Sequence, residues 1–425
     1  FFIIRKGKAG GLPPSNWLSK FGGSAWGYLP ATDEYYLHLF HVSQADLNWE
    51  NPHVRDACCD VVNFWIEKGV KGFRFDVINL ISKPESYEDD LCGDGHKFYT
   101  DLPKVHEFLK ELNRRTFGRF EDIITVGEMA SSDLENSIRY SGRATEELSM
   151  IFDFHHLKID YPSGNKWEIQ PFRFHDLKHN LFTWQTEMEK GDGWHALFWY
   201  NHDQPRIVSR IGDEGKYRVE SAKMLATVLH GLRGTPYIYQ GEEIGMTNAG
   251  FQDISQYRDI ETLNVFNRLK SEGKTDGEVY GSLQKKSRDN ARTPMQWDDT
   301  ETAGFTDGTP WIEVNGNCRR INTLDRENPD SIFQYYKNLI ALRKAYPVIQ
   351  EGSFVPLLEE DPRILAYRRV LDGQELTVAC NFFGEETALP QGLLPETGRV
   401  LISNYPQEGK RDGLRPYEAV MVLRG

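Results

Sequence analysis

Short apolar runs alternate along the chain with longer segments whose apolar residues recur every three or four positions. The longer segments have helical spacing, and Gly69 follows the first of them as a helix-ending residue. These helical segments cover residues 53–68, 104–117, 216–232 and 328–345. The apolar runs cover residues 72–78, 123–128, 150–154, 196–203 and 235–243. This alternation predicts five strands of a parallel sheet or barrel.

Each of the five runs ends in polar residues, and in α/β barrels the catalytic groups sit at the carboxyl ends of the strands. The pattern therefore predicts a (β/α)8 barrel, a TIM barrel, of which these are strands four to eight. A closed barrel needs eight strands, so we expect three strand-helix units, on the order of 100 residues at about 30 per unit, to precede residue 1.

The spacing of apolar residues also divides the chain. Residues 1–50, rich in glycine and aromatics with one alternating strand at 35–41, predict a small excursion domain. Residues 51–350 predict the barrel, with an elaborated loop at about 244–311 that is too long and polar to be a simple connection. Short alternating segments in residues 351–425 predict a separate antiparallel β-domain.

Composition narrows the class of protein. With 425 residues, of which 39% are hydrophobic, the chain can bury a large core. The 63 acidic residues outnumber the 50 Lys and Arg residues, and the formal net charge of −13 repels phosphate backbones. We therefore expect no nucleic-acid partner, and an anionic substrate would need a local basic patch. A monomer that binds a small molecule is expected.

Cysteine usage and hydropathy bear on the compartment. The five cysteines form an odd count without a CxxC pair, which predicts free thiols in a reducing compartment. They are Cys58, Cys59, Cys92, Cys318 and Cys380. No stretch approaches the roughly 20 apolar residues of a membrane span, and no secretion signal is seen at the start. A cytoplasmic protein with no membrane partner is therefore expected.

Three of the predicted strand ends carry an acid: Asp76, Glu128 and Asp203. A retaining glycosidase needs a nucleophilic carboxylate and a carboxylic acid about 5 to 5.5 Å apart. Arg74, two residues before Asp76, shares its strand face and should pair with it. Glu128 follows an apolar run and Gly127, surroundings that raise a carboxyl pKa. A single acid at a strand end is more often an ordinary polar residue. Three acids at strand ends, each with these neighbours, favour one catalytic site at the carboxyl end of the barrel.

Three segments around these acids resemble conserved regions of the α-amylase superfamily: Gly-Phe-Arg-Phe-Asp at 72–76, Val-Gly-Glu at 126–128 and Asn-His-Asp-Gln-Pro-Arg at 201–206. Segments 21–26, 44–51, 241–246 and 287–297 are similar to its oligo-1,6-glucosidase branch.

The resemblance implies Asp76 as nucleophile, Glu128 as acid/base and Asp203 as transition-state stabiliser. It also implies a pocket for the non-reducing glucose, lined by Arg74, His202, Phe40, Gln44 and one of Arg288 or Arg292. The chain departs from the branch at Ala45, where proline is usual, and the family's early Asp and His of this pocket belong to the segment expected before residue 1.

Further segments, at 93–101, 127–132, 152–162 and 166–167, resemble the branch that hydrolyses trehalose 6-phosphate. A sugar phosphate carries about two negative charges, which need a few well-placed donors. Lys158 and Lys166 follow the predicted sixth barrel strand and are the candidates. The alternative is that both are solvated surface lysines, since exposed lysine is common.

No cofactor is implied, although the segment expected before residue 1 could hold a calcium ion. His155 and His156 are not expected to bind a metal, because neighbours on a strand face opposite sides. Three alternative functions stay open: an α-1,6-glucosidase that acts on isomaltose-like ends, a transglycosylating isomerase, and a catalytically inactive barrel that serves as a binding subunit.

Overall fold

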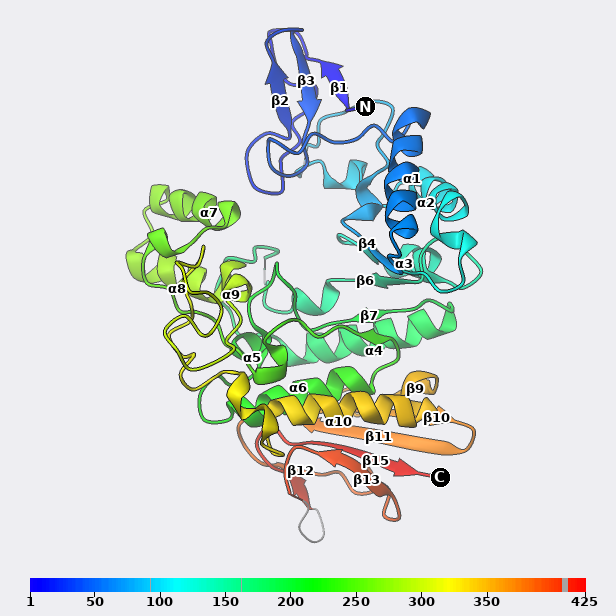
Figure 1. Cartoon of the computed structure of the whole chain (residues 1–425), viewed down its shortest axis with the longest axis vertical. Coiled ribbons are helices and arrows are strands. Elements are labelled where there is room, and N and C mark those ends of the chain that lie inside the picture. Colours follow the sequence, from blue (N-terminus) through cyan, green and yellow to red (C-terminus); the bar gives the residue numbers. More distant parts are fainter. Residues whose placement is uncertain (92, 162, 407–411) are drawn as a thin grey trace. The chain divides into compact units, whose positions relative to one another are not determined.

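The computed structural model describes residues 1–91, 93–161, 163–406 and 412–425, and its elements are shown in Figure 1. It divides into two compact units. The first comprises Phe1–Phe154 and Lys190–Ala196, and the second comprises His155–Glu189 and Leu197–Gly425. Each unit has its own strands and its own buried core, and each is described separately below.

The first unit begins with a three-stranded antiparallel sheet in the order β1-β3-β2. Its strands are β1 (Ile4–Lys6), β2 (Trp26–Leu29) and β3 (Glu34–Leu37). The strand expected at 35–41 is therefore present but shorter, and it has two partners that the sequence pattern did not indicate. Trp17 and Trp26 are buried beneath this sheet with Ile3 and Leu37, so these tryptophans are core residues.

A parallel sheet in the order β4-β5-β6 is the centre of the first unit. The strands are β4 (Gly72–Phe75), β5 (Ile124–Glu128) and β6 (Met150–Phe152), and Ile151 forms a parallel bridge to His195. The helices are α1 (Pro52–Glu67), α2 (Lys104–Arg115) and α3 (Leu134–Ser141). Asn51 caps α1 by accepting a hydrogen bond from the backbone N–H of His53, and Pro52 opens the helix. The predicted alternation of strand and helix is confirmed here.

Short 3-10 helices connect these elements: η1 (Ile78–Leu80), η2 (His96–Phe98) and η3 (Phe117–Arg119). In the second unit η4 (His155–Leu157) follows β6. The expectation that His155 and His156 lie on a strand is therefore wrong, because β6 ends at Phe152 and the chain turns into η4.

The last two predicted barrel strands are the shortest, β7 (Ala196–Leu197) and β8 (Thr235–Pro236). The N–H of Tyr237 donates to the carbonyl of Leu197 at 2.7 Å. The helices of this part are α4 (Phe174–Lys190), α5 (Ile207–Ile211), α6 (Arg218–Gly231), α10 (Ile332–Ala345) and α11 (Pro347–Gln350). From Ser221 to Gly231 every residue of α6 is buried, including Lys223 and His230, which hydrogen-bond to the carbonyls of Asp330 and Ala226.

The long polar segment after β8 is folded. It contains η5 (Glu242–Ile244), η6 (Ile254–Gln256), α7 (Ile260–Ser271), α8 (Asp276–Lys286) and α9 (Asp289–Arg292), and η7 (Thr323–Glu327) follows. Val265 of α7 and Val279 and Leu283 of α8 form a small core. Asp259 caps α7, and Thr275 with Glu278 forms a capping box at α8.

The chain ends in the predicted antiparallel β-domain, a sheet in the order β13-β15-β11-β10-β9 beside the pair β12-β14. Figure 1 shows α6 and α10 lying along this sheet, and their side chains share its core. The strands are β9 (Ser353–Leu357), β10 (Ile364–Leu371), β11 (Gln374–Asn381), β12 (Thr387–Ala388), β13 (Arg399–Ser403), β14 (Gly413–Leu414) and β15 (Ala419–Arg424). The exact domain limits at 50 and 350, and the three units before residue 1, stay predictions.

The cysteines and the hydropathy of the helices can be compared with the expectations of free thiols and of no membrane span. Cys58, Cys59, Cys318 and Cys380 are free thiols, and Cys92 lies outside the described residues. In the part of the chain that the structure describes, no helix combines the length and the apolar character needed to cross a membrane.

Candidate active site

Arg74 connects two of the three predicted catalytic acids. Its Nη1 donates to Oδ1 of Asp76 at 2.6 Å, and its Nη2 donates to Oε2 of Glu128. The two arms of one guanidinium therefore bind two carboxylates, so both acids contact a single side chain. The pairing of Arg74 with Asp76, expected from their spacing on one strand, is present.

The parallel pairing of β4 with β5 produces this arrangement. Arg74 lies opposite Val126 and Phe75 lies opposite Gly127 in the register, so both strands end at the same edge. Asp76 follows the last residue of β4, and Glu128 is the last residue of β5. Carboxyl ends of parallel strands are where α/β barrels carry their chemistry.

The two acids differ in exposure. The side chain of Asp76 is 71% exposed, whereas that of Glu128 is 8% exposed. Two carboxyl groups in unequal surroundings can divide the work of a nucleophile and an acid between them. The burial expected for Glu128 is thus observed.

The turn that carries Asp76 has an unusual backbone. Val77 has φ 37° and ψ 42°, in the left-handed region. A β-branched residue rarely adopts this conformation, which costs on the order of 1–3 kcal/mol and persists only where neighbouring contacts impose it.

In the second unit, two arginines hold Asp203. Its Oδ1 accepts from Nη1 of Arg288 at 3.0 Å and from Nη2 of Arg292 at 2.6 Å. Nε2 of His202 lies 3.4 Å from Oδ2 of Asp203. Nε of Arg292 also donates to the carbonyl of His202 at 2.8 Å. The sequence left open which of the two arginines serves this site, and both contact Asp203.

Two further acids, which the sequence analysis missed, hold Arg288. Oδ1 of Asp259 accepts from Nε of Arg288 at 3.1 Å and also from its Nη2, and Glu261 lies 3.6 Å from that Nε. Burial alone would raise the pKa of Asp259, but the hydrogen bonds and charge of Arg288 lower it overall. Asp259 also caps α7 by accepting from the N–H and the hydroxyl of Thr262, a local role that gives no sign of the distant contact with Arg288.

The two candidate phosphate ligands differ. Nζ of Lys166 lies 2.6 Å from Oε2 of Glu261, and both side chains are largely buried. Lys166 is therefore joined through Glu261 to Arg288 and is not a solvated surface lysine. Lys158, by contrast, is exposed.

The other predicted pocket residues lie in the first unit, where Phe40 packs edge-on against Phe21 with ring centroids 5.8 Å apart. Oε1 of Gln44 accepts from the N–H of His41 at 3.0 Å. Their role as pocket residues stays a prediction. So does the gathering of all three acids, because Asp76 and Glu128 belong to the first unit and Asp203 to the second.

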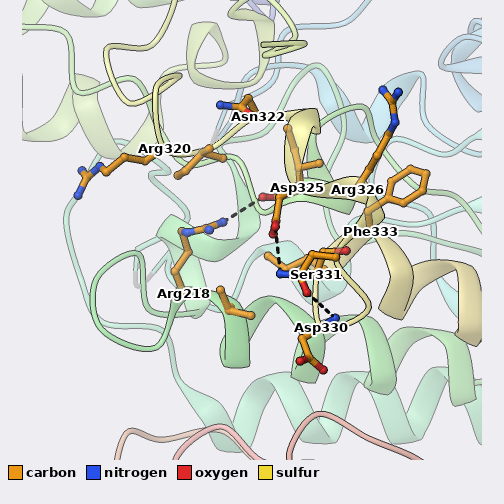
Figure 2. Close-up of a pocket in the computed structure, with 13 residues that line it drawn as sticks. Arg218, Arg320, Asn322, Asp325, Arg326, Asp330, Ser331 and Phe333 are labelled. Atoms are coloured by element: carbon orange, nitrogen blue, oxygen red, sulfur yellow. Dashed lines mark hydrogen bonds between the residues drawn. The ribbon is translucent and has the colours of Figure 1, made fainter. Parts of the chain in front are cut away.

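A cavity of about 150 Å³ lies elsewhere in the second unit, beside the N-terminus of α10, and none of the predicted site residues lines it. Arg218, Arg320 and Arg326 are among its lining residues. Figure 2 shows that the guanidinium groups of Arg320 and Arg326 point away from one another and do not converge on an anion. Within the described ranges, no group of three or more His, Cys, Asp or Glu side chains could hold a metal ion.

Comparisons with known proteins give these positions a context. The family model described as alpha amylase, catalytic domain, matches residues 1–352. The chain is 52% identical to the trehalose-6-phosphate hydrolase of Bacillus subtilis (strain 168) over 428 residues, 99% of this chain and 76% of that protein.

A second relative differs in its named substrate. The chain is 50% identical to the oligo-1,6-glucosidase of Parageobacillus thermoglucosidasius over 434 residues, 99% of this chain and 76% of that protein. Among solved structures, the trehalose-6-phosphate hydrolase of Bacillus licheniformis superposes with a TM-score of 0.93 at 53% identity, covering 100% of this chain and 78% of that one.

Proposed function

The chain belongs to the α-amylase family, and from that membership we propose that it is a retaining glycoside hydrolase that cleaves trehalose 6-phosphate to glucose and glucose 6-phosphate. The observation that carries the proposal is the single guanidinium of Arg74 between the carboxylates of Asp76 and Glu128. Retention requires two carboxyl groups at close separation, about 5 to 5.5 Å, on either side of the scissile bond.

The residues divide the reaction into two steps. The exposed carboxylate of Asp76 attacks the anomeric carbon while Glu128 protonates the leaving oxygen, so a glucosyl-aspartate ester forms and glucose 6-phosphate departs. Glu128, now a carboxylate, takes a proton from water, and the hydroxide breaks the ester and regenerates Asp76. We assign Asp203, held by Arg288 and Arg292, to stabilisation of the transition state through the sugar hydroxyls.

Each of these roles falls to a side chain, so the proposal requires no cofactor. Arg74, His202, Phe40, Gln44 and the two arginines that hold Asp203 are assigned to the pocket for the non-reducing glucose.

For the phosphate, both lysines are candidates: Lys158 is an exposed residue, and Lys166 is paired with Glu261. To bind phosphate, Lys166 would have to exchange that partner for the ligand. The two lysines can be separated by replacing each with alanine and measuring kcat/KM for trehalose 6-phosphate and for trehalose. Replacing a lysine that binds the phosphate should lower kcat/KM more for trehalose 6-phosphate than for trehalose. Equal losses on both sugars would show that the lysine does not bind the phosphate.

A single incubation tests the reaction and the substrate together. The protein is mixed with trehalose 6-phosphate, and glucose and glucose 6-phosphate are measured in equal amounts as they appear, with Glu128→Gln as the inactive control. No cleavage of trehalose 6-phosphate under conditions where isomaltose is hydrolysed would refute the substrate. The 50% identity to an oligo-1,6-glucosidase makes hydrolysis of α-1,6-linked glucosides the second candidate function.

A further inference from the structure

We propose that Asn79 is a positioning residue for the reaction, which sets the separation of Asp76 and Glu128 by joining the turn after β4 to the end of β5. The inference rests on the proposed roles of these two acids and does not depend on the phosphate of the substrate. Asn79 lies three residues after Asp76, in η1, and its side chain contacts the backbone two residues after Glu128.

The side-chain amide of Asn79 makes three hydrogen bonds. Its Oδ1 accepts from the N–H of Ala130 at 3.0 Å, and its Nδ2 donates to the carbonyl of Ala130 at 3.1 Å and to Oδ1 of Asp101 at 2.9 Å. The residue is 0% exposed, so water does not compete for these bonds. One side chain thus holds both backbone groups of Ala130 and fixes the direction of the chain as it leaves Glu128.

Asn79 is itself held in place by neighbouring groups. Asp101 accepts a second hydrogen bond at Oδ1, from Oη of Tyr140 at 2.8 Å, and its N–H donates to the carbonyl of Asn79 at 3.2 Å. Tyr140 is also fully buried. The amide of Asn79 therefore has a fixed orientation before any substrate binds.

A second contact joins the same two segments. A Cβ atom added at Gly127 would lie 3.2 Å from Cγ2 of Ile78, and only 2.5 Å from the side chains of Leu148 and Met129. The turn that carries Asp76 therefore packs directly on the backbone of β5, one residue before Glu128. The left-handed conformation of Val77, between Asp76 and Ile78, needs such anchors to persist.

The arrangement matters because the separation of the two carboxyl groups decides the chemistry. Retaining enzymes hold them about 5 to 5.5 Å apart and inverting enzymes about 6.5 to 9.5 Å apart, and a misplacement of about 1 Å can cost on the order of 100-fold in rate. Arg74 acts on the carboxylates themselves, whereas Asn79 acts on the backbone that presents them.

The test compares Asn79→Leu, which keeps the side-chain volume and removes the amide, with a matched control. Gln185 in α4 makes the same pair of bonds, since Nε2 donates to the carbonyl of Arg233 at 2.9 Å and Oε1 accepts from its N–H at 2.7 Å. Gln185 is also buried, at 3% exposure. Gln185→Leu therefore removes an equivalent pair of buried hydrogen bonds to a backbone, at a place that does not connect the segments carrying the two acids.

The substrates are 4-nitrophenyl α-glucoside, α-glucosyl fluoride and an α-linked disaccharide, assayed where circular dichroism shows each variant folded. We expect Asn79→Leu to lower kcat on the disaccharide about 10- to 100-fold, with KM changed less than about threefold. The loss should be smaller on the fluoride, because that leaving group needs less protonation by Glu128. Gln185→Leu should keep kcat within about twofold of the wild type.

A kcat for Asn79→Leu within threefold of the wild type would overturn the inference, and so would an equal loss in Gln185→Leu. If the leucine variant does not fold, Asn79→Asp takes its place, because it keeps the side-chain size and the bond from the N–H of Ala130. The same kcat limits then apply to Asn79→Asp. A wild-type protein that cleaves the aryl glucoside but leaves trehalose 6-phosphate intact refutes the proposed substrate alone, and the comparison of variants still stands.

Discussion

Replacing Asp259 by asparagine tests one of the two acids that hold Arg288. The asparagine keeps an oxygen that can cap α7 through Thr262. The atom that contacts the Arg288 guanidinium is no longer a charged carboxylate oxygen but a neutral amide group. A hydrogen bond to a charged group contributes about 1.5–3 kcal/mol. Arg288 keeps Asp203 and Glu261 as partners, so the loss should stay below the roughly 3–5 kcal/mol of a fully orphaned buried charge. We expect about 2 kcal/mol less stability and about 10- to 30-fold lower kcat/KM.

The dependence on pH has a definite sign. The pKa of Asp259 is lower in the folded chain than its usual value, so its contribution is complete above about pH 4–5 and is lost as pH falls through the folded pKa. Urea unfolding of wild type and Asp259→Asn should therefore differ most at pH 7 and converge below about pH 4.

The control is Asp253→Asn. Asp253 caps η6 by accepting from the N–H of Ser255 at 2.8 Å, but it is solvent-exposed, and no arginine pairs with it in the part of the chain that the structure describes. Asp253→Asn should lower the free energy of unfolding less than Asp259→Asn does, with kcat/KM unchanged. Equal losses in the two variants, or a difference for Asp259→Asn that is independent of pH, would refute the assigned role.

Two other buried ionisable groups, Glu242 and Arg343, give predictions. Burial raises the pKa of Glu242 to about 8, above its usual value near 4.3, so the folded state keeps a proton that the unfolded state releases, and stability falls as pH rises from about 5 to 8. Glu242→Gln, which keeps an acceptor for Tyr336, should lose less Tm over that interval than the wild type, and parallel Tm profiles would contradict this. Arg343 donates to the carbonyls of His230, Leu232 and Gly234, in and just after the last turn of α6, so Arg343→Leu should lower the free energy of unfolding by about 3 kcal/mol or more. The control is Arg363, which pairs with Glu385 at the surface, so Arg363→Leu should cost under about 1 kcal/mol. Equal urea midpoints for the Arg343 and Arg363 variants would contradict the prediction.

Local patterns were enough to predict where the barrel strands begin, because the residues of a buried parallel strand form a consecutive apolar run. The predicted ends of the last two strands are wrong: the runs at 196–203 and 235–243 continue past β7 and β8, which end at Leu197 and Pro236, so Asp203 lies in the loop after β7. The pairing of Arg74 with Asp76 followed from strand periodicity alone, since residues two apart share a face. The contact of Arg74 with Glu128 did not, because it depends on the register of β4 against β5.

The missed features involve partners distant in sequence or polar residues at core positions. Asp259 and Glu261 are about 30 residues before the arginine that they hold, and a helix cap looks the same with or without such a partner. Helix α4 was not indicated because Lys178 and Gln185 occupy buried positions on it, where they bond to backbone carbonyls and interrupt the apolar pattern. The hydrogen bonds of the Asn79 side chain to the backbone of Ala130 likewise join residues that are 51 positions apart.

Trapping the covalent intermediate tests the central claim most directly. The protein is incubated with 5-fluoro-α-glucosyl fluoride, digested, and its peptides are mapped by mass spectrometry. The account predicts one added fluoroglucosyl group on the peptide that contains Asp76, and none when Asp76→Ala is treated in the same way. A label on another carboxylate, or a first product that proton NMR identifies as β-glucose, would contradict it.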